Sequence, residues 1–79
     1  MRLTWVEGED GVARGYHRGS LRPVAEVHFN HRPPPLHLER WIAYVDGQEV
    51  GASHHPGLAR TLAEDRYAAR LREQRRRIR

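Results

Sequence analysis

Neither cysteine nor lysine occurs in this chain of 79 residues. Without cysteine, the protein has no disulfide and no thiolate metal ligand to supplement a core that must be small at this length. Without lysine or cysteine, covalent catalysis would depend on a few hydroxyl groups with no strong activating partner. We therefore expect one small domain over residues 1–79 that has no enzymatic activity.

Long apolar runs are absent as well. No stretch approaches the ~18 apolar residues of a membrane-spanning helix. The acidic residues Glu7, Glu9 and Asp10 follow the first few residues at once, which is not typical of a signal peptide. These features predict an intracellular protein with no membrane partner.

Arginine is abundant and unevenly distributed. Residues 57–79 hold eight of the fourteen arginines against three acidic residues, a formal charge of +5, whereas residues 1–56 have a formal charge of −1. A GC-rich genome also produces arginine in place of lysine, but codon bias does not explain where the arginines lie. Because a guanidinium group binds phosphates and carboxylates in a forked geometry, the basic end suits contact with nucleic acid or with an acidic protein surface.

The first part of the chain has the patterns of short β-strands. Residues 2–7 and 12–18 flank a glycine-rich stretch at 8–11 that favours a turn. Polar and apolar side chains alternate over residues 22–31, as in a strand with one solvated face. Three consecutive prolines at 33–35 then end that strand, because proline cannot donate to a β-ladder.

The clearest local signal is Asp46-Gly47 between two β-rich arms, which predicts a two-residue hairpin turn. Trp41, Ala43, Val45 and Val50 then share one face of the hairpin, and Ile42 and Tyr44 share the other. The pairs that this turn predicts are Val45 with Gln48, Ala43 with Val50, and Trp41 with Ala52.

A helix is expected from about Gly57 to Arg77. Leu58 and Leu62 begin one apolar stripe, and Ala59 and Ala63 begin a second stripe beside it. The arginines gather at its C-terminal end, where the helix dipole favours cations. The expected architecture is an α+β fold in which an antiparallel sheet of four to five strands, within a β-rich body over residues 1–56, carries the basic C-terminal helix of residues 57–79 on one face.

The core is expected to use the large apolar side chains. The main candidates are Leu3, Trp5, Val6, Val24, Val27, Phe29, Leu36, Leu38, Trp41, Ile42, Tyr44, Val45, Val50, Leu58, Leu62, Tyr67 and Leu71.

Six histidines raise the question of a metal site. His28 and His31, three residues apart, point to opposite faces of a regular strand, and no cysteine completes a mixed site. A site would need several of His28, His31, His37, His54 and His55 to converge from different segments. We therefore expect no metal and no other cofactor.

The stretch Gly51-Ala52-Ser53-His54-His55 is similar to the Gly-Ser-His-His stretch of HicA-type mRNA-interferase toxins, whose fold resembles double-stranded-RNA-binding domains and whose histidine there is catalytic. Two features depart from that pattern. An alanine separates the glycine from the serine, and the stretch precedes the helix instead of following a first helix. The resemblance covers five residues and implies a nucleic-acid-binding module as one alternative.

The small size, the layout of a sheet plus one helix, and the hairpin from Trp41 to Gly51 resemble small phage-encoded proteins, most of all the anti-CRISPR inhibitors of type I systems. The resemblance covers about half of the chain and includes no diagnostic motif. It implies a non-catalytic inhibitor, active in the cytoplasm of a bacterial host, that docks on a subunit of a type I CRISPR surveillance complex. Such an inhibitor would block binding of target DNA or recruitment of the nuclease.

Two functions therefore stand as hypotheses. The first is the protein inhibitor, for which the expected partner-binding residues are Arg66, Arg70, Arg72 and Arg76 on the helix, with Tyr44 and Glu49 as a second surface on the sheet. The alternative is a small nucleic-acid-binding module of double-stranded-RNA-binding or toxin–antitoxin type. In that case the phosphate contacts would come from Arg70, Arg72, Arg75, Arg76, Arg77 and Arg79. A homodimer fits either hypothesis, because it would extend a small core and cover a strand edge.

Overall fold

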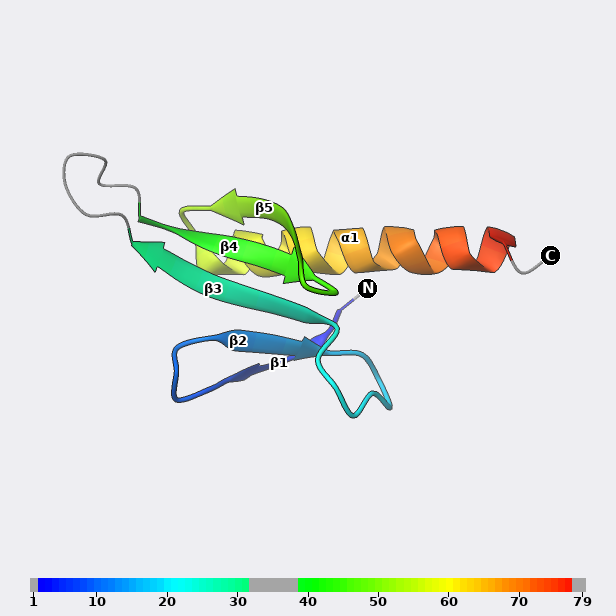
Figure 1. Cartoon of the computed structure of the whole chain (residues 1–79), viewed down its shortest axis with the longest axis horizontal. Coiled ribbons are helices and arrows are strands. Elements are labelled where there is room, and N and C mark those ends of the chain that lie inside the picture. Colours follow the sequence, from blue (N-terminus) through cyan, green and yellow to red (C-terminus); the bar gives the residue numbers. More distant parts are fainter. Residues whose placement is uncertain (1, 32–38, 78–79) are drawn as a thin grey trace.

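Five strands and then one helix follow one another along the chain (Figure 1). The computed structural model describes residues 2–31 and 39–77. Its elements are β1 (Thr4–Glu7), β2 (Ala13–Tyr16), β3 (Ala25–His31), β4 (Glu39–Val45), β5 (Gln48–Ser53) and α1 (Pro56–Arg77). The prolines at 33–35, Leu36, His37 and Leu38, on which predictions were made, lie outside the described residues.

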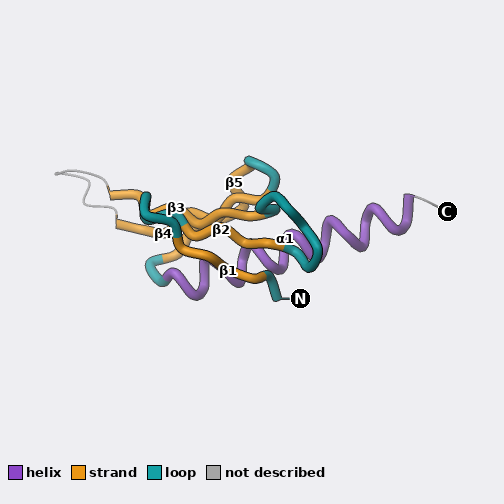
Figure 2. Tube along the Cα trace, turned by 90° about the horizontal axis from the view of Figure 1, so that it is seen from below, coloured by secondary structure: helices purple, strands orange, loops and turns teal. Residues whose placement is uncertain are grey.

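The strands form one antiparallel sheet in the order β1-β2-β3-β4-β5, so every strand pairs with its neighbour in sequence. Helix α1 packs on one face of this sheet, against β3, β4 and β5 (Figure 2). The predicted α+β fold is therefore confirmed, with the larger of the two expected strand numbers. The free edges of the sheet are those of β1 and β5, and dimer formation through them stays a prediction.

The β4–β5 turn has the geometry that its sequence predicts. Asp46 and Gly47 both adopt positive φ, at 51° and 79°, as a tight hairpin turn requires. Val45 pairs with Gln48 as expected, but the predicted pairings of Ala43 with Val50 and of Trp41 with Ala52 are wrong. A β-bulge shifts the register by one residue, so Ala43 pairs with Gly51 and Trp41 pairs with Ser53.

The bulge places Gly51 opposite Ala43 on the face that meets the helix. A Cβ atom at position 51 would lie 3.0 Å from Cδ1 of Leu62, closer than an ordinary van der Waals contact. The extra residue therefore brings a glycine to the point where α1 approaches β5. The preference for glycine at position 51 cannot be predicted from the hairpin sequence alone, because it depends on the position of Leu62 in the helix.

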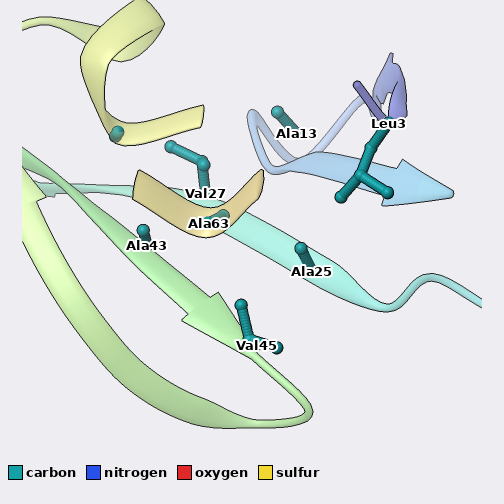
Figure 3. Close-up of a cluster of buried hydrophobic side chains, with 8 residues drawn as sticks. Leu3, Ala13, Ala25, Val27, Ala43, Val45 and Ala63 are labelled. Atoms are coloured by element: carbon teal, nitrogen blue, oxygen red, sulfur yellow. The ribbon is translucent and has the colours of Figure 1, made fainter. Parts of the chain in front are cut away.

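The core consists mainly of alanine and valine (Figure 3). The buried apolar side chains are Leu3, Ala13, Ala25, Val27, Ala43, Val45, Ala59 and Ala63. The expectation that large apolar residues form the core is correct for Leu3, Val27 and Val45 and wrong for four others. Those four are Val6, Phe29, Leu58 and Leu62, which are exposed.

On the helix, the second of the two predicted stripes faces the sheet. Ala59 and Ala63 are 0% exposed, whereas Leu58 is 55% and Leu62 is 39% exposed. Alanine has the smallest side chain that still favours a helix, so this stripe allows close approach to the sheet. The leucines flank the contact instead of filling it.

The N-terminal strand is tied to the helix by one carboxylate. The backbone N–H of Leu3 donates to Oε2 of Glu64 at 2.7 Å, and the indole Nε1 of Trp5 donates to the same oxygen at 3.1 Å. Helix α1 lies mainly against β3, β4 and β5, so these two hydrogen bonds, together with the ion pair between Arg60 and Glu7 at 2.9 Å, link the helix to the N-terminal end of the sheet.

Replacing Glu64 with alanine should therefore lower the free energy of unfolding by about 1–3 kcal/mol, because two partly buried donors lose their acceptor. Urea unfolding followed by tryptophan fluorescence measures this change. Glu64→Gln is the matched control, since its amide oxygen can still accept, and it should cost clearly less. Equal stability of Glu64→Ala and the wild type would show that the two donors are satisfied by solvent.

Candidate functional site

Helix α1 is held to the sheet along its first two thirds. Ala59 and Ala63 are buried against the sheet, and Glu64 accepts two hydrogen bonds from the N-terminal part of the chain. Further along the helix, the hydroxyl of Tyr67 lies 3.3 Å from Nδ1 of His17. Arg70 makes the last side-chain hydrogen bonds between the helix and the described part of the sheet. Beyond that residue the helix continues past the edge of the sheet (Figures 1 and 2), so its final turns stand clear of the body.

Arg72, Arg75 and Arg76 lie on this projecting part of the helix, and we refer to them as the arginine face. Their spacing of three and four residues places the three side chains next to one another on one side of the helix. All three are exposed, and among the described residues no carboxylate forms an ion pair with them. The arginine face therefore offers three available guanidinium groups within about one turn.

The direction of the arginine face follows from helix geometry. Arg70 points at the β4–β5 turn, and Arg72 comes two residues later, which corresponds to about half a turn of an α-helix. Arg72 and Arg76 therefore lie on the side of α1 opposite to Arg70. Ala68 and Ala69 precede them on that side, and their small side chains leave the surface of the helix there without bulky groups.

Arg70 was predicted to be one of the partner-binding residues, but in the structure it contacts the β4–β5 turn. Its Nη1 donates to Oδ2 of Asp46 at 2.7 Å, and its Nη2 donates to Oε1 of Gln48 at 2.7 Å. We refer to this forked contact as the hairpin anchor. A crevice of about 200 Å³ beside it is lined by Asp46, Arg70, Glu73 and Gln74.

Arg66 is exposed and has no ion pair within the described ranges. It precedes Arg72 by six residues, or about one and two-thirds turns, so it lies on another side of the helix. The side chains of Arg77 and Arg79 lie outside the described residues. Of the arginines expected to bind a partner, the structure thus brings Arg72, Arg75 and Arg76 together and separates Arg66 and Arg70 from them.

Tyr44 and Glu49 are neighbours, as the predicted second surface requires. They pair directly across β4 and β5 and lie on the sheet face opposite to α1. The Tyr44 ring also lies 4.9 Å from the ring of His28 on β3, measured between centroids. This surface and the arginine face lie on different sides of the molecule, so a flat partner would contact one of them and not both.

The face that carries Tyr44 is not strongly charged. Arg14 pairs with Asp10 at 2.8 Å and with Glu26 at 3.4 Å. The hydrogen bond from Arg14, together with one from the Val12 backbone N–H, lowers the pKa of Asp10 to about 2. Asp10 is therefore ionised at neutral pH and offsets the charge of Arg14, so this face lacks the cationic character of the helix end.

A groove of about 480 Å³ lies between the start of α1 and the sheet, and its lining includes Ala13, Trp41 and Gly57. Its charged lining residues, Glu7 and Arg60, are paired with each other at 2.9 Å. The two charges therefore offset each other next to the apolar lining residues.

Within residues 2–31 and 39–77, no three histidine or acidic side chains converge in a way that could hold a metal ion. His37 and the side chain of His31 lie outside the described residues. Over the same ranges, no helix is both long enough and apolar enough to cross a membrane.

The sequence alone did not identify Asp46, Gln48 and Glu64 as partners of helix and strand groups. Asp46 is readily assigned to a turn, but nothing in its spacing relates that turn to a residue 24 positions later.

In comparisons with known proteins, no family model, no curated protein and no solved structure matches the chain. The function must therefore be inferred from the geometry of this molecule.

Proposed function

We propose that this protein is a non-catalytic nucleic-acid-binding module that contacts phosphates through the arginine face. The observation that supports the proposal is the projection of α1 beyond the sheet with Arg72, Arg75 and Arg76 exposed and without ion pairs among the described residues. Three adjacent cations with one nearby carboxylate, Glu73, leave a net positive charge that suits a polyanion, since binding replaces condensed counterions around the phosphates.

The surroundings of the arginine face favour nucleic acid over a protein partner. Protein interfaces derive most of their energy from a few desolvated anchors, many of them aromatic, in a partly apolar centre. Around the arginine face the exposed side chains of the helix are glutamate, glutamine and arginine, and none is aromatic. Attraction between charges is the main interaction that such a surface offers, and phosphates are its natural partner.

The arrangement also carries a cost that a polyanion would remove. Arg72 and Arg76 are one turn apart, and like charges at this spacing destabilise a helix by a few tenths of a kcal/mol. The final turns receive little support from the described part of the sheet, because Arg70 makes the last hydrogen bonds between the two. A bound phosphate backbone would relieve the repulsion and stabilise the end of the helix.

The test is a fluorescence-anisotropy titration of the protein with duplex DNA, duplex RNA and single-stranded DNA. Three phosphate contacts on a duplex predict a slope of log K against log salt of roughly −2.7, so affinity should fall by about 40-fold between about 50 and 200 mM salt. Several unrelated duplex sequences should bind with similar affinity, because phosphate contacts carry no sequence information. Failure to bind any of these ligands at about 50 mM salt would reject the proposal.

The second candidate is the protein inhibitor of a type I CRISPR complex, and the observation that favours it is the sheet face with Tyr44, Glu49 and His28. These side chains lie together on a face that no other described element covers, and tyrosine is enriched among residues that dominate interfaces. This candidate ranks second because the resemblance behind it has no diagnostic motif.

A plasmid-interference assay in a strain with an active type I system distinguishes the two candidates. Under the inhibitor hypothesis, expression of the protein should restore plasmid uptake, and the double variant Tyr44→Ala/Glu49→Arg should abolish that effect. Normal interference in the presence of the wild-type protein would reject this candidate for the system tested.

A further inference from the structure

The hairpin anchor is the contact at which α1 leaves the sheet. Arg70 uses both of its terminal nitrogens, each at 2.7 Å, on acceptors that flank Gly47. Its side chain is 29% exposed and that of Asp46 is 58% exposed, so the pair is not buried. A forked contact to two acceptors fixes direction better than a single ion pair does.

The acceptors of the anchor are themselves held in place. Asp46 and Gly47 form the two-residue turn at positive φ, and Gln48 pairs with Val45 in the first rung of the hairpin. A guanidinium that joins this turn therefore connects the helix to a rigid part of the sheet. The arginine face begins two residues later, without a hinge between them.

From this geometry we infer that Arg70 is a positioning residue: it directs the arginine face toward the nucleic acid and does not itself contact phosphate. The inference rests on the proposed function. Its chemical reason is that both Nη atoms of Arg70 already donate to acceptors of the hairpin, and that the side chain points to a different side of α1 from Arg72 and Arg76. Release of the anchor would let the final turns of the helix change direction and fray.

Asp46→Asn separates positioning from direct contact, because the two roles predict changes of opposite sign. The substitution removes a negative charge and weakens the hold on Arg70, while asparagine still tolerates the positive φ of the turn. If Arg70 contacted phosphate, the freed arginine and the more positive protein would bind duplex DNA more tightly. A positioning role predicts binding about threefold weaker than that of the wild type in spite of the added charge.

The slope of log K against log salt provides the second readout. Arg70→Gln should weaken binding about threefold at every salt concentration with the slope unchanged, since no phosphate contact is lost. Arg75→Gln is the matched control, because the same substitution within the arginine face should reduce the magnitude of the slope by roughly 0.9. Tighter or equal binding by Asp46→Asn, or a reduced slope for Arg70→Gln, would overturn the inference.

Hydrogen exchange distinguishes failure of this inference from failure of the proposed function. If the wild-type protein binds no nucleic acid, the proposed function is rejected, and the anchor is then tested by the exchange rates of the amides of residues 71–76. Exchange at least about threefold faster in Asp46→Asn than in the wild type, with unchanged rates in the sheet, would show that the anchor holds the helix end. Unchanged rates at residues 71–76 would show that it does not.

Discussion

Simultaneous replacement of Arg72 and Arg76 with glutamate is expected to weaken binding to duplex DNA at least about tenfold at low salt. The two side chains lie one turn apart on the arginine face, on a side of α1 that points away from the hairpin anchor. Their reversal removes two of the three proposed phosphate contacts and places two negative charges where the phosphates would approach. Reversal of two arginines outside the arginine face should have a much smaller effect on binding.

The same titration should include two comparison variants. Arg18→Glu/Arg22→Glu changes the net charge equally at exposed positions in the loop between β2 and β3, and it should reduce affinity much less. Arg72→Gln/Arg76→Gln preserves good helix formers and should reduce the magnitude of the salt slope by roughly 1.8. Equal losses in the two reversal variants would mean that binding depends on total charge, and the arginine face would lose its special role.

Replacement of Ala63 with leucine should lower the free energy of unfolding by about 1–3 kcal/mol, the cost of adding atoms to a filled core. Ala63 is 0% exposed and belongs to the buried cluster that includes Val27, Ala43 and Val45 (Figure 3). Three added carbon atoms would push α1 away from β3 and β4. For a domain of this size, the expected change in Tm is a decrease of roughly 5–20 °C.

Thermal unfolding followed by circular dichroism measures this change, and Ala68→Leu is the control. Alanine and leucine differ little in helix propensity, and Ala68 is half-buried on a different side of the same helix. Its replacement should alter stability by less than about 0.5 kcal/mol. A wild-type Tm for Ala63→Leu would indicate that the space between helix and sheet can expand, in conflict with a closely packed alanine stripe.

Local rules predicted the elements of this fold well. The Asp46-Gly47 turn, the alternating strand before the prolines, and a helix that starts near Gly57 all follow from patterns within a few residues. Their locations agree with β3, the β4–β5 hairpin and α1. Errors arose where a second element intervened, as at the bulge beside Gly51, whose position depends on Leu62 of the helix.

The core illustrates the same limit. From residue type alone, Leu58 and Leu62 are better core candidates than Ala59 and Ala63. Both stripes have helical spacing, so periodicity does not choose between them. The choice depends on how close the helix axis lies to the sheet, and that distance is a property of the packed molecule.

For the candidate site, too, the sequence predicted some features and the tertiary structure decided others. Composition was enough to predict a basic C-terminal helix, because charge and helix propensity belong to the residues themselves. The folded chain decided which arginines remain available: Arg70 is engaged by a turn 24 residues away, whereas Arg72, Arg75 and Arg76 lie past the edge of the sheet. Whether a charged side chain can bind a partner depends on which groups of its own chain reach it first, and only the packing of helix on sheet determines that.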